Sequence, residues 1–217
     1  AHGRRVALVG SAVVTDDHGS DVDSHDVVAR TKFFGPRYLQ ASRHVGTKTN
    51  IGFYNKAMLT HIQRAVESRE TDVRQSLRAL DLVICKRVTS LGNSTTIARG
   101  CPTFFTPALL GVRAVFHLLL AEPAELSLFG LDFYLATHAH APADFAEVKR
   151  QERGERRSNA HYCMSFGQHH PVSQIRFVRN LWKAGAVVPY GRTTEVLAMS
   201  DLEYVTALEE RYANWEE

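Results

Sequence analysis

Short apolar segments recur along this chain and alternate with longer segments in which apolar residues repeat at helical spacing. The apolar segments predict short buried strands at residues 6–9, 26–29, 50–54, 82–85, 125–129 and 186–188. The longer segments predict helices at residues 57–66, 109–120 and 172–184. Strands that alternate with helices favour a parallel sheet covered on both faces, with ligands bound beyond the carboxyl ends of the strands.

The length of the chain fits one such domain. The chain has 217 residues, of which 44% are hydrophobic, so it can form one sizeable core but is short for two full domains. We therefore expect residues 1–217 to form a single α/β domain with a Rossmann-like, mostly parallel sheet flanked by helices. Ser200 and Glu203 form a capping-box pattern, and the apolar residues that follow it predict a C-terminal helix over about 201–215.

One long segment, residues 136–159, is polar and rich in His, Arg and Glu. It has too few apolar residues to pack firmly, so we expect a mobile lid loop with a helical patch. Its basic residues are interrupted by glutamates, which favours a solvated helical face over a polyanion site. Residues 71–100 contain no motif that we can assign.

Charge and cysteine content narrow the classes of function. The formal net charge is +3, and basic residues are interleaved with acidic ones. We therefore expect no nucleic-acid partner, whereas an anionic small molecule is permitted. The three cysteines have no metal-ligand spacing, which argues against a zinc site or a disulfide framework and favours a reducing compartment. The sequence has no apolar run of about 18 residues and no signal-peptide pattern, so we expect a soluble chain, with membrane association only through further segments.

The turn after the first predicted strand is suited to binding an anion. Gly10 and Ser11 follow that strand, where backbone N–H groups can face a ligand. The tetrapeptide Asp-Ser-His-Asp at 23–26 then leads into the second strand. The segments VALVGSAVVTDDHGSDVDSHDVVARTKFF and HVGTKTNIGFYN together resemble the long N-terminal motif of the sialyltransferases.

Two later segments resemble the other motifs of the same superfamily. TPALLGVRAVFHLLL followed by AELSLFGLDFY is similar to the short motif, and GLDFY is especially similar to the bacterial sialyltransferases. His169, His170 and Pro171 open the next predicted helix and resemble the third motif. The three motifs occur in the expected order and span roughly three quarters of the chain, which makes a chance similarity implausible.

The resemblance implies an inverting, metal-independent glycosyltransferase of polysaccharide biosynthesis. Such an enzyme transfers sialic acid or a related nonulosonic acid from a CMP-activated donor to a hydroxyl group of a glycan or glycolipid acceptor, without a further cofactor. Two alternatives stay open. One is a transferase of the same fold that uses CMP-Kdo, and the other is a catalytically silent nucleotide-binding domain. The chain could form a homo-oligomer under each of these three interpretations.

Sialyl transfer needs a base for the acceptor hydroxyl and a hydrogen-bond donor for the departing phosphate. By resemblance, His169 is the base and His170 is the alternate. The other interpretation is that the two histidines only cap the helix beginning near Pro171. Tyr134, at the end of GLDFY, aligns with a tyrosine that donates to the leaving phosphate, and His140 stands where a second tyrosine is expected.

The resemblance also implies a set of donor-binding residues: Gly10, Ser11, Lys32, Thr106, Pro107, Ala108, Gly130 and Asp132. Ser11 and Lys32 replace asparagines of the family, and Lys32 brings a cation that can pair with a phosphate or carboxylate. Asp132 would bind the cytidine end of the donor, or else cap neighbouring N–H groups. Pro107 and Ala108 hinder the close backbone approach that a glycine allows.

The sequence differs from the sialyltransferase motifs at two positions that concern the cellular location of the protein and the surroundings of the proposed base. Animal sialyltransferases pair a cysteine at the start of the first motif with one in the second, whereas here Val6 takes the first place and the second motif has no cysteine. This favours a cytoplasmic bacterial enzyme, which could associate with a membrane, over one in the Golgi lumen. Gln174 stands where the third motif carries an acidic residue five positions after its histidine.

Two other functions receive less support from the sequence. Asp21 and Asp23 have the spacing of the metal-binding pair of other nucleotide-sugar transferases. However, Asp23 belongs to the Asp-Ser-His-Asp string and a CMP donor has a single phosphate, so we expect no metal. A nucleotide-dependent oxidoreductase is disfavoured because Gly10 is the only glycine of its turn and Gly-x-Gly-x-x-Gly is absent.

Overall fold

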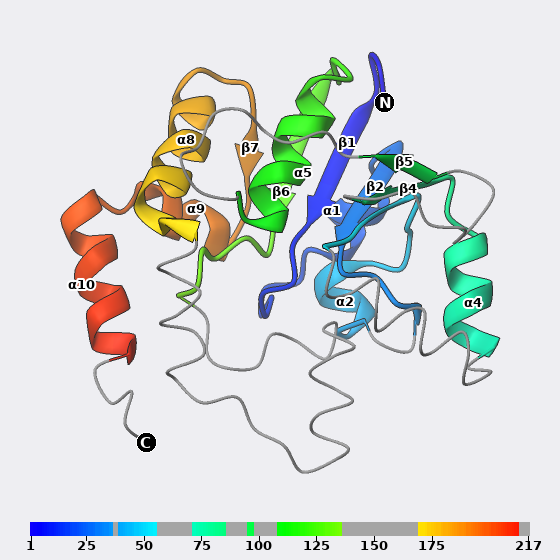
Figure 1. Ribbon diagram of the computed structural model, residues 1–217, viewed down its shortest axis with the longest axis horizontal. Coiled ribbons are helices and arrows are strands. Elements are labelled where there is room, and N and C mark those ends of the chain that lie inside the picture. Colours follow the sequence, from blue (N-terminus) through cyan, green and yellow to red (C-terminus); the bar gives the residue numbers. More distant parts are fainter. Residues whose placement is uncertain (37–38, 56–70, 86–94, 98–107, 136–168, 213–217) are drawn as a thin grey trace, which may run out of the picture.

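The structure is a computed structural model that describes residues 1–36, 39–55, 71–85, 95–97, 108–135 and 169–212. Within these ranges, seven strands form one sheet in the order β5-β4-β3-β2-β1-β6-β7. Every pair of neighbouring strands is parallel. Helices flank the sheet (Figure 1). The predicted α/β class with a Rossmann-like sheet is confirmed.

The strands are β1 (Arg5–Val9), β2 (Val27–Thr31), β3 (Ile51–Phe53), β4 (Leu82–Cys85), β5 (Thr95–Ile97), β6 (Glu125–Phe129) and β7 (Val188–Pro189). The helices are α1 (Gly19–Asp23), α2 (Ser42–Val45), α4 (Thr71–Arg78), α5 (Leu110–Leu119), α8 (Pro171–Lys183), α9 (Arg192–Ala198) and α10 (Asp201–Tyr212). The predicted strand at 26–29 begins one residue before the observed β2, and the predicted strand at 186–188 begins two residues before the observed β7.

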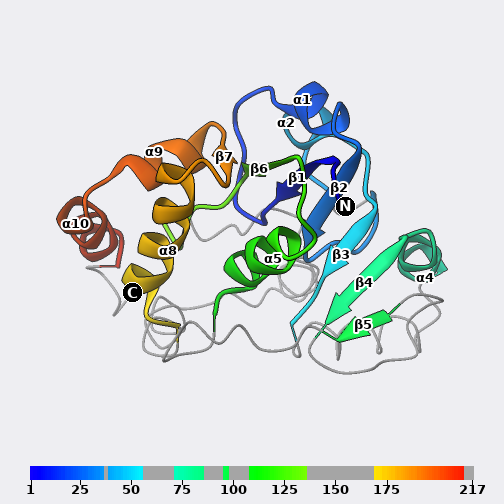
Figure 2. The ribbon, with the colours of Figure 1, turned by 90° about the horizontal axis from the view of Figure 1, so that it is seen from above.

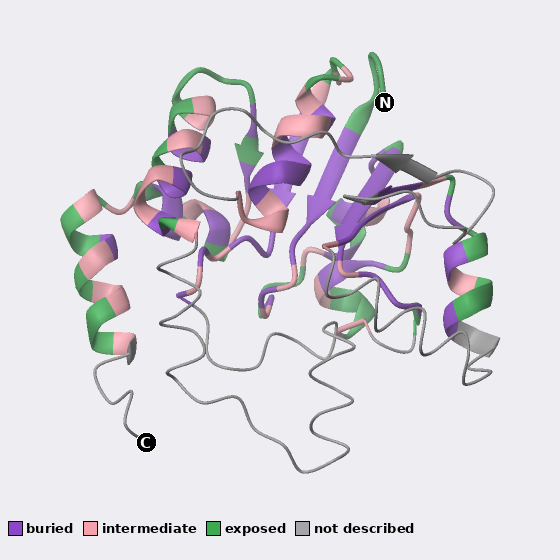
Figure 3. Ribbon diagram, in the orientation of Figure 1, coloured by how far each residue is buried: buried purple, intermediate pink, exposed green. Residues whose placement is uncertain are grey.

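The side chains of each strand alternate between two faces of the sheet. Leu8 and Leu128 belong to a buried cluster that includes residues of α5 and α8. Val9 and Phe129 belong to a second cluster that includes residues of α1 and α2. Figure 2 shows the two pairs of helices on opposite faces of the sheet. The middle strands are therefore buried on both sides, as the colours of Figure 3 show.

The order of the strands in the sheet reverses at β1. The strands β2 to β5 follow one another on one side of β1, and β6 and β7 lie on its other side. In parallel sheets, ligands bind beside the carboxyl ends of the strands at such a switch point. Gly10, directly after β1, donates its N–H to the carbonyl oxygen of Phe129 over 2.7 Å. A Cβ atom at residue 10 would lie 2.1 Å from the Gly130 carbonyl oxygen, so only glycine fits here.

The predicted capping box at the start of α10 is confirmed. The Ser200 N–H donates to Glu203 Oε2 over 2.6 Å, and the Glu203 N–H donates to Ser200 Oγ over 3.2 Å. The helix α10 ends at Tyr212 in the described structure, and residues 213–217 lie outside the described ranges. Tyr204, on the buried face of α10, belongs to the same core cluster as residues of α8 and α9.

Some predictions fall outside the described residues, namely the helix at 57–66 and the lid loop at 136–159. Five described elements were not predicted: the helices α1, α2, α4 and α9 and the strand β5. In the part of the chain that the structure describes, every helix is too short or too polar to cross a membrane.

Candidate functional site

The segments that carry the three sequence motifs meet at the carboxyl edge of the sheet. Gly10 and Ser11 follow β1, Lys32 follows β2, and the turn 130–135 follows β6. The first turns of α5 and α8 face the same edge (Figure 1). A Cβ atom at Gly111 of α5 would lie 2.7 Å from the Leu131 side chain, and one at Gly10 would lie equally close to it. Leu131 therefore joins β1, β6 and α5 at this edge.

The turn after β6 has an unusual backbone. Gly130, Phe133 and Tyr134 have φ angles of 61°, 50° and 74°, in the left-handed region that side-chain-bearing residues rarely occupy. Two buried contacts hold the turn. The Leu131 N–H donates to Thr193 Oγ1 over 3.0 Å, and the Tyr204 hydroxyl donates to the Phe133 carbonyl oxygen over 2.5 Å. The helices α9 and α10 thus fix a strained turn that presents Tyr134, half-buried, at the edge of the sheet.

The two candidate base residues at the start of α8 have different environments. His170 is exposed, has a φ angle of 40° and is the N-cap of α8, accepting at Nδ1 from the Ser173 N–H over 3.4 Å. The Ser173 hydroxyl also donates to the His170 carbonyl oxygen over 2.9 Å. Pro171 takes the first helical position, where its missing N–H costs nothing. The capping interpretation therefore holds for His170, whereas His169 is half-buried and precedes the cap.

Gln174 connects the start of α8 to the start of α5. Its side chain is wholly buried. Its Nε2 donates to the His169 carbonyl oxygen. Its Oε1 accepts from the Leu109 N–H over 2.6 Å. A neutral amide can donate and accept at once, whereas an ionised carboxylate can only accept. Gln174 can therefore donate to a carbonyl oxygen on one side and accept from an N–H group on the other.

Asp23, of the alternative metal-binding pair, already has three donors. Its carboxylate accepts from the Thr47 N–H and the Lys48 N–H, each over 2.9 Å, and from the Thr47 hydroxyl over 3.0 Å. Burial raises the pKa of Asp23, but these hydrogen bonds outweigh burial and hold the pKa below its usual value. Asp23 therefore anchors the turn between α2 and β3. Among the described residues, no three His, Cys, Asp or Glu side chains are arranged to hold a metal ion.

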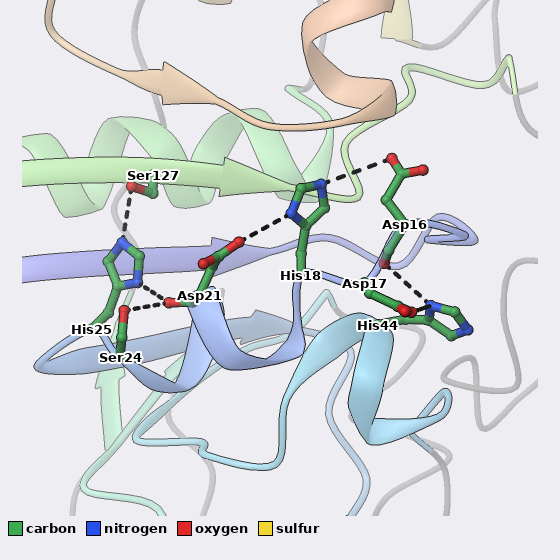
Figure 4. A network of polar contacts seen from close by, with 8 residues as sticks. All are labelled: Asp16, Asp17, His18, Asp21, Ser24, His25, His44 and Ser127. Atoms are coloured by element: carbon green, nitrogen blue, oxygen red, sulfur yellow. Dashed lines mark hydrogen bonds and ion pairs between the residues drawn. The ribbon is translucent and has the colours of Figure 1, made fainter.

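His25, in the same tetrapeptide, is a structural residue. It is 2% exposed, and its Nε2 lies 2.9 Å from Ser127 Oγ on β6 (Figure 4). Its Nδ1 carries a proton, because it lies 2.7 Å from the Asp21 carbonyl oxygen, which can only accept. Asp26 Oδ2 accepts from the Arg5 N–H over 2.8 Å. The Asp-Ser-His-Asp string thus fixes α1 and β2 to the central strands.

Two further histidines support the segment that follows Gly10 and Ser11. His18 Nδ1 lies 3.3 Å from Asp21 Oδ2, and His44 Nδ1 lies 3.2 Å from Asp17 Oδ1 (Figure 4). His18 also packs against the rings of Phe129 and Tyr190, with centroid distances of 5.7 and 5.9 Å. These contacts tie the segment to α2 and to the end of β6. Neither histidine was predicted as a site residue, because Phe129 and Tyr190 lie far from His18 in the sequence and Asp17 lies far from His44.

A small cavity lies beside the carboxyl ends of β1 and β2. Its volume is about 10 Å³. It is lined by Val9, Gly10, Arg30, Thr31, Lys32, Phe33, Leu39, Gln40 and Val45. Lys32 has a φ angle of 59°, and its N–H donates to the Phe53 carbonyl oxygen over 3.0 Å. Gln40 closes one side, since its side chain bonds the Val14 N–H and the Ala12 carbonyl oxygen over 2.9 Å each. Two donor-binding candidates, Gly10 and Lys32, thus share one cavity.

The other residues that the sequence predicted for the site lie as follows. Ala108 is half-buried just before α5 and packs against the core, and Asp132 is half-buried in the turn after β6. Thr106, Pro107 and His140 lie outside the described residues. Arg30, which lines the cavity, was not predicted as a site residue, because it lies one residue beyond the predicted strand at 26–29, whereas the observed β2 includes it.

Neither the protein-family models nor the curated proteins that were compared with this chain gave a match.

Proposed function

We propose that this chain is an inverting, metal-independent glycosyltransferase that transfers sialic acid or a related nonulosonic acid from a CMP-activated donor to a glycan hydroxyl. One observation carries the proposal. Three segments far apart in the sequence, each of which resembles a sialyltransferase motif, converge at the switch point of a parallel sheet. Gly10 contacts Gly130 there, Leu131 contacts Gly111, and Gln174 joins Leu109 to His169.

His169 is the proposed base. An imidazole has an ordinary pKa near ~6.5 and can take a proton from an acceptor hydroxyl at neutral pH. His170 is less suited, because its Nδ1 accepts from the Ser173 N–H and its backbone forms the cap of α8. The resemblance favours His169 as the base, and the capping role of His170 favours the same choice.

Tyr134 is the proposed donor to the departing phosphate. A phenol is a neutral donor that stabilises a developing oxyanion without a cation. Its backbone φ of 74° is held by the turn that Thr193 and Tyr204 fix, so the position of the residue is set before any ligand binds. Lys32, at the end of β2, adds a positive charge at the same edge of the sheet.

A transfer assay tests the proposal. The chain is incubated with CMP-sialic acid or with CMP-Kdo, in excess chelator, with and without a mixture of glycan acceptors, and CMP release is measured. The proposal expects CMP release from CMP-sialic acid that survives the chelator. Release from CMP-Kdo alone would favour the Kdo transferase, and CMP binding without release would favour the silent domain. Inhibition by chelator that manganese reverses would favour a metal-dependent mechanism. A cytoplasmic, bacterial location remains part of the proposal.

A further inference from the structure

Arg30 is a charged residue in the middle of the sheet. It lies on β2 and is 2% exposed. Its Nε donates to Thr49 Oγ1 over 2.9 Å and contacts the Lys48 carbonyl oxygen at 3.2 Å. Its Nη2 donates to the carbonyl oxygens of Val45 and Lys48 over 2.8 and 2.9 Å. Two of the three guanidinium nitrogens are therefore satisfied by the backbone and side chains around the end of α2.

The third nitrogen, Arg30 Nη1, is buried and has no hydrogen-bond partner among the residues that the structure describes. Such a donor costs free energy unless a ligand or a water molecule satisfies it. Burial lowers the pKa of Arg30 to about 10, so the group keeps its charge at neutral pH. Asp23 acts on this charge only through space, because its oxygens accept from Thr47 and Lys48. Arg30 thus has both a spare donor and a charge without a direct ion pair in the described structure.

The size of the cavity beside Arg30 limits which ligand groups can contact the guanidinium. It is lined by Val45, whose carbonyl oxygen holds Arg30 Nη2, and it extends to Gly10 and Lys32 at the edge of the sheet. Its volume of about 10 Å³ admits one water-sized atom group. The cavity is too small for a whole phosphate group and is suited to a single terminal oxygen of a larger ligand.

We propose that this cavity binds one oxygen of an anionic group, with Arg30 Nη1 as the donor at its base and Lys32 beside its opening. The inference rests on the proposed function for the identity of the ligand, since a CMP-activated acidic sugar carries both a phosphate and a carboxylate. It adds a contact that the resemblance does not supply. The CMP-sugar would accept a hydrogen bond from a buried guanidinium on the face of the sheet that α1 and α2 cover.

Charge favours an anionic oxygen over water. A hydrogen bond to an anion from a charged donor is roughly twice as strong as a neutral one. Water, in contrast, needs two to four polar partners, and much of the lining is apolar: Val9, Phe33, Leu39 and Val45. The amide of Gln40 is already used by Ala12 and Val14.

A titration of the unmodified chain tests the contact. The guanidinium signals of ¹⁵N-arginine-labelled protein are recorded by NMR during additions of CMP, cytidine, free sialic acid and inorganic phosphate, with Arg30→Lys used for assignment. A shift with CMP but not cytidine identifies the phosphate, and a shift with free sialic acid identifies the carboxylate. If saturating CMP, sialic acid and phosphate all leave the Arg30 signals unchanged, the cavity holds water and the proposal is wrong.

A second variant closes the cavity without touching Arg30. Val45→Ile adds one methyl group to the wall of the cavity, whereas Val14→Ile, in the same hydrophobic cluster but outside the lining, is the matched control. We expect Val45→Ile to weaken binding of the responsive anion by about 10- to 100-fold, the range for one hydrogen bond to a charged group, and Val14→Ile to leave it unchanged. Equal affinities in the two variants would overturn the proposal.

The two measurements also separate this site from the proposed function. If inorganic phosphate shifts the Arg30 signals and CMP binds no more tightly than phosphate, the anion site stands and the nucleotide-dependent function fails. If CMP-sialic acid is turned over while the Arg30 signals do not move, the function stands and the anion site fails.

Discussion

The side-chain amide of Gln174 donates to the carbonyl oxygen of His169, and this bond fixes the residue that we propose as the base. The same amide accepts from the Leu109 N–H at the start of α5. Because the side chain is wholly buried, neither bond competes with water. The two helix starts that face the carboxyl edge of the sheet are therefore coupled through one neutral side chain.

Gln174→Glu should destabilise the chain by about 1–3 kcal/mol at neutral pH, because the ionised carboxylate cannot donate to His169 and is buried without a cation. A protonated glutamate can donate, so the folded state should raise the pKa of the new carboxyl group. The loss relative to the unsubstituted chain is then small below about pH 4.3, the ordinary pKa of glutamate, and grows as the pH rises. Chemical unfolding of both proteins across this pH range measures the difference.

Gln174→Met is the matched control for this prediction. It removes both hydrogen bonds but introduces no titratable group, so its loss of stability should not vary with pH relative to the unsubstituted chain. A pH-independent difference for Gln174→Glu would contradict the assigned donor and acceptor roles.

Asp23→Asn should lower stability by about 1–3 kcal/mol, because an amide oxygen replaces a carboxylate that accepts from Thr47 and Lys48. The folded state lowers the pKa of Asp23. Its contribution is therefore present above the unfolded value of about 3.9 and is lost as the pH falls through the folded value. Urea unfolding at pH 6 and at pH 3 should show a difference that shrinks at low pH. Asp17→Asn, at an exposed carboxylate, should show little difference at either pH.

Gly10→Ala should abolish folding or cost about 3 kcal/mol or more, because the new Cβ atom meets the Gly130 backbone at 2.1 Å. Gly111→Ala is the comparison, since its Cβ atom meets only the end of the Leu131 side chain at 2.7 Å. That side chain can move, and alanine favours the helix, so the cost should stay below about 1 kcal/mol. Thermal unfolding of the two variants measures the difference. Similar stabilities would mean that β1 and β6 do not approach as described.

Much of the fold could be predicted because its strands are buried on both faces. β1 and β4 contain continuous apolar runs, β6 has three apolar residues around Ser127, and α5 and α8 have apolar residues at helical spacing. β5 was missed because its sequence, Thr-Thr-Ile, forms no apolar run. α4 was missed because only Val73 and Leu77 are apolar in a short polar segment.

The site was less predictable because its contacts join distant parts of the chain. His25 meets Ser127 across 102 residues, and no local pattern reveals that pairing. Arg30 is held by carbonyl oxygens 15 and 18 residues further along, which only the folded turn after α2 brings to it. The role of Gln174 likewise depends on Leu109, 65 residues earlier. Local sequence identified the turns at the sheet edge, whereas the buried polar side chains that support them needed the structure.

His169 and His170 should separate cleanly by substitution, because only His170 caps α8. His169→Ala should lower turnover of the CMP-sugar by about 10²- to 10⁴-fold, the range for loss of a general base, and leave the affinity for CMP nearly unchanged. His170→Asn should retain both turnover and stability, since asparagine caps helices well and tolerates the left-handed backbone that His170 has, with its φ of 40°. Single-turnover kinetics, CMP titration and thermal unfolding on the two variants give the three readouts. Normal turnover in His169→Ala together with loss in a stable His170→Asn would move the base by one residue.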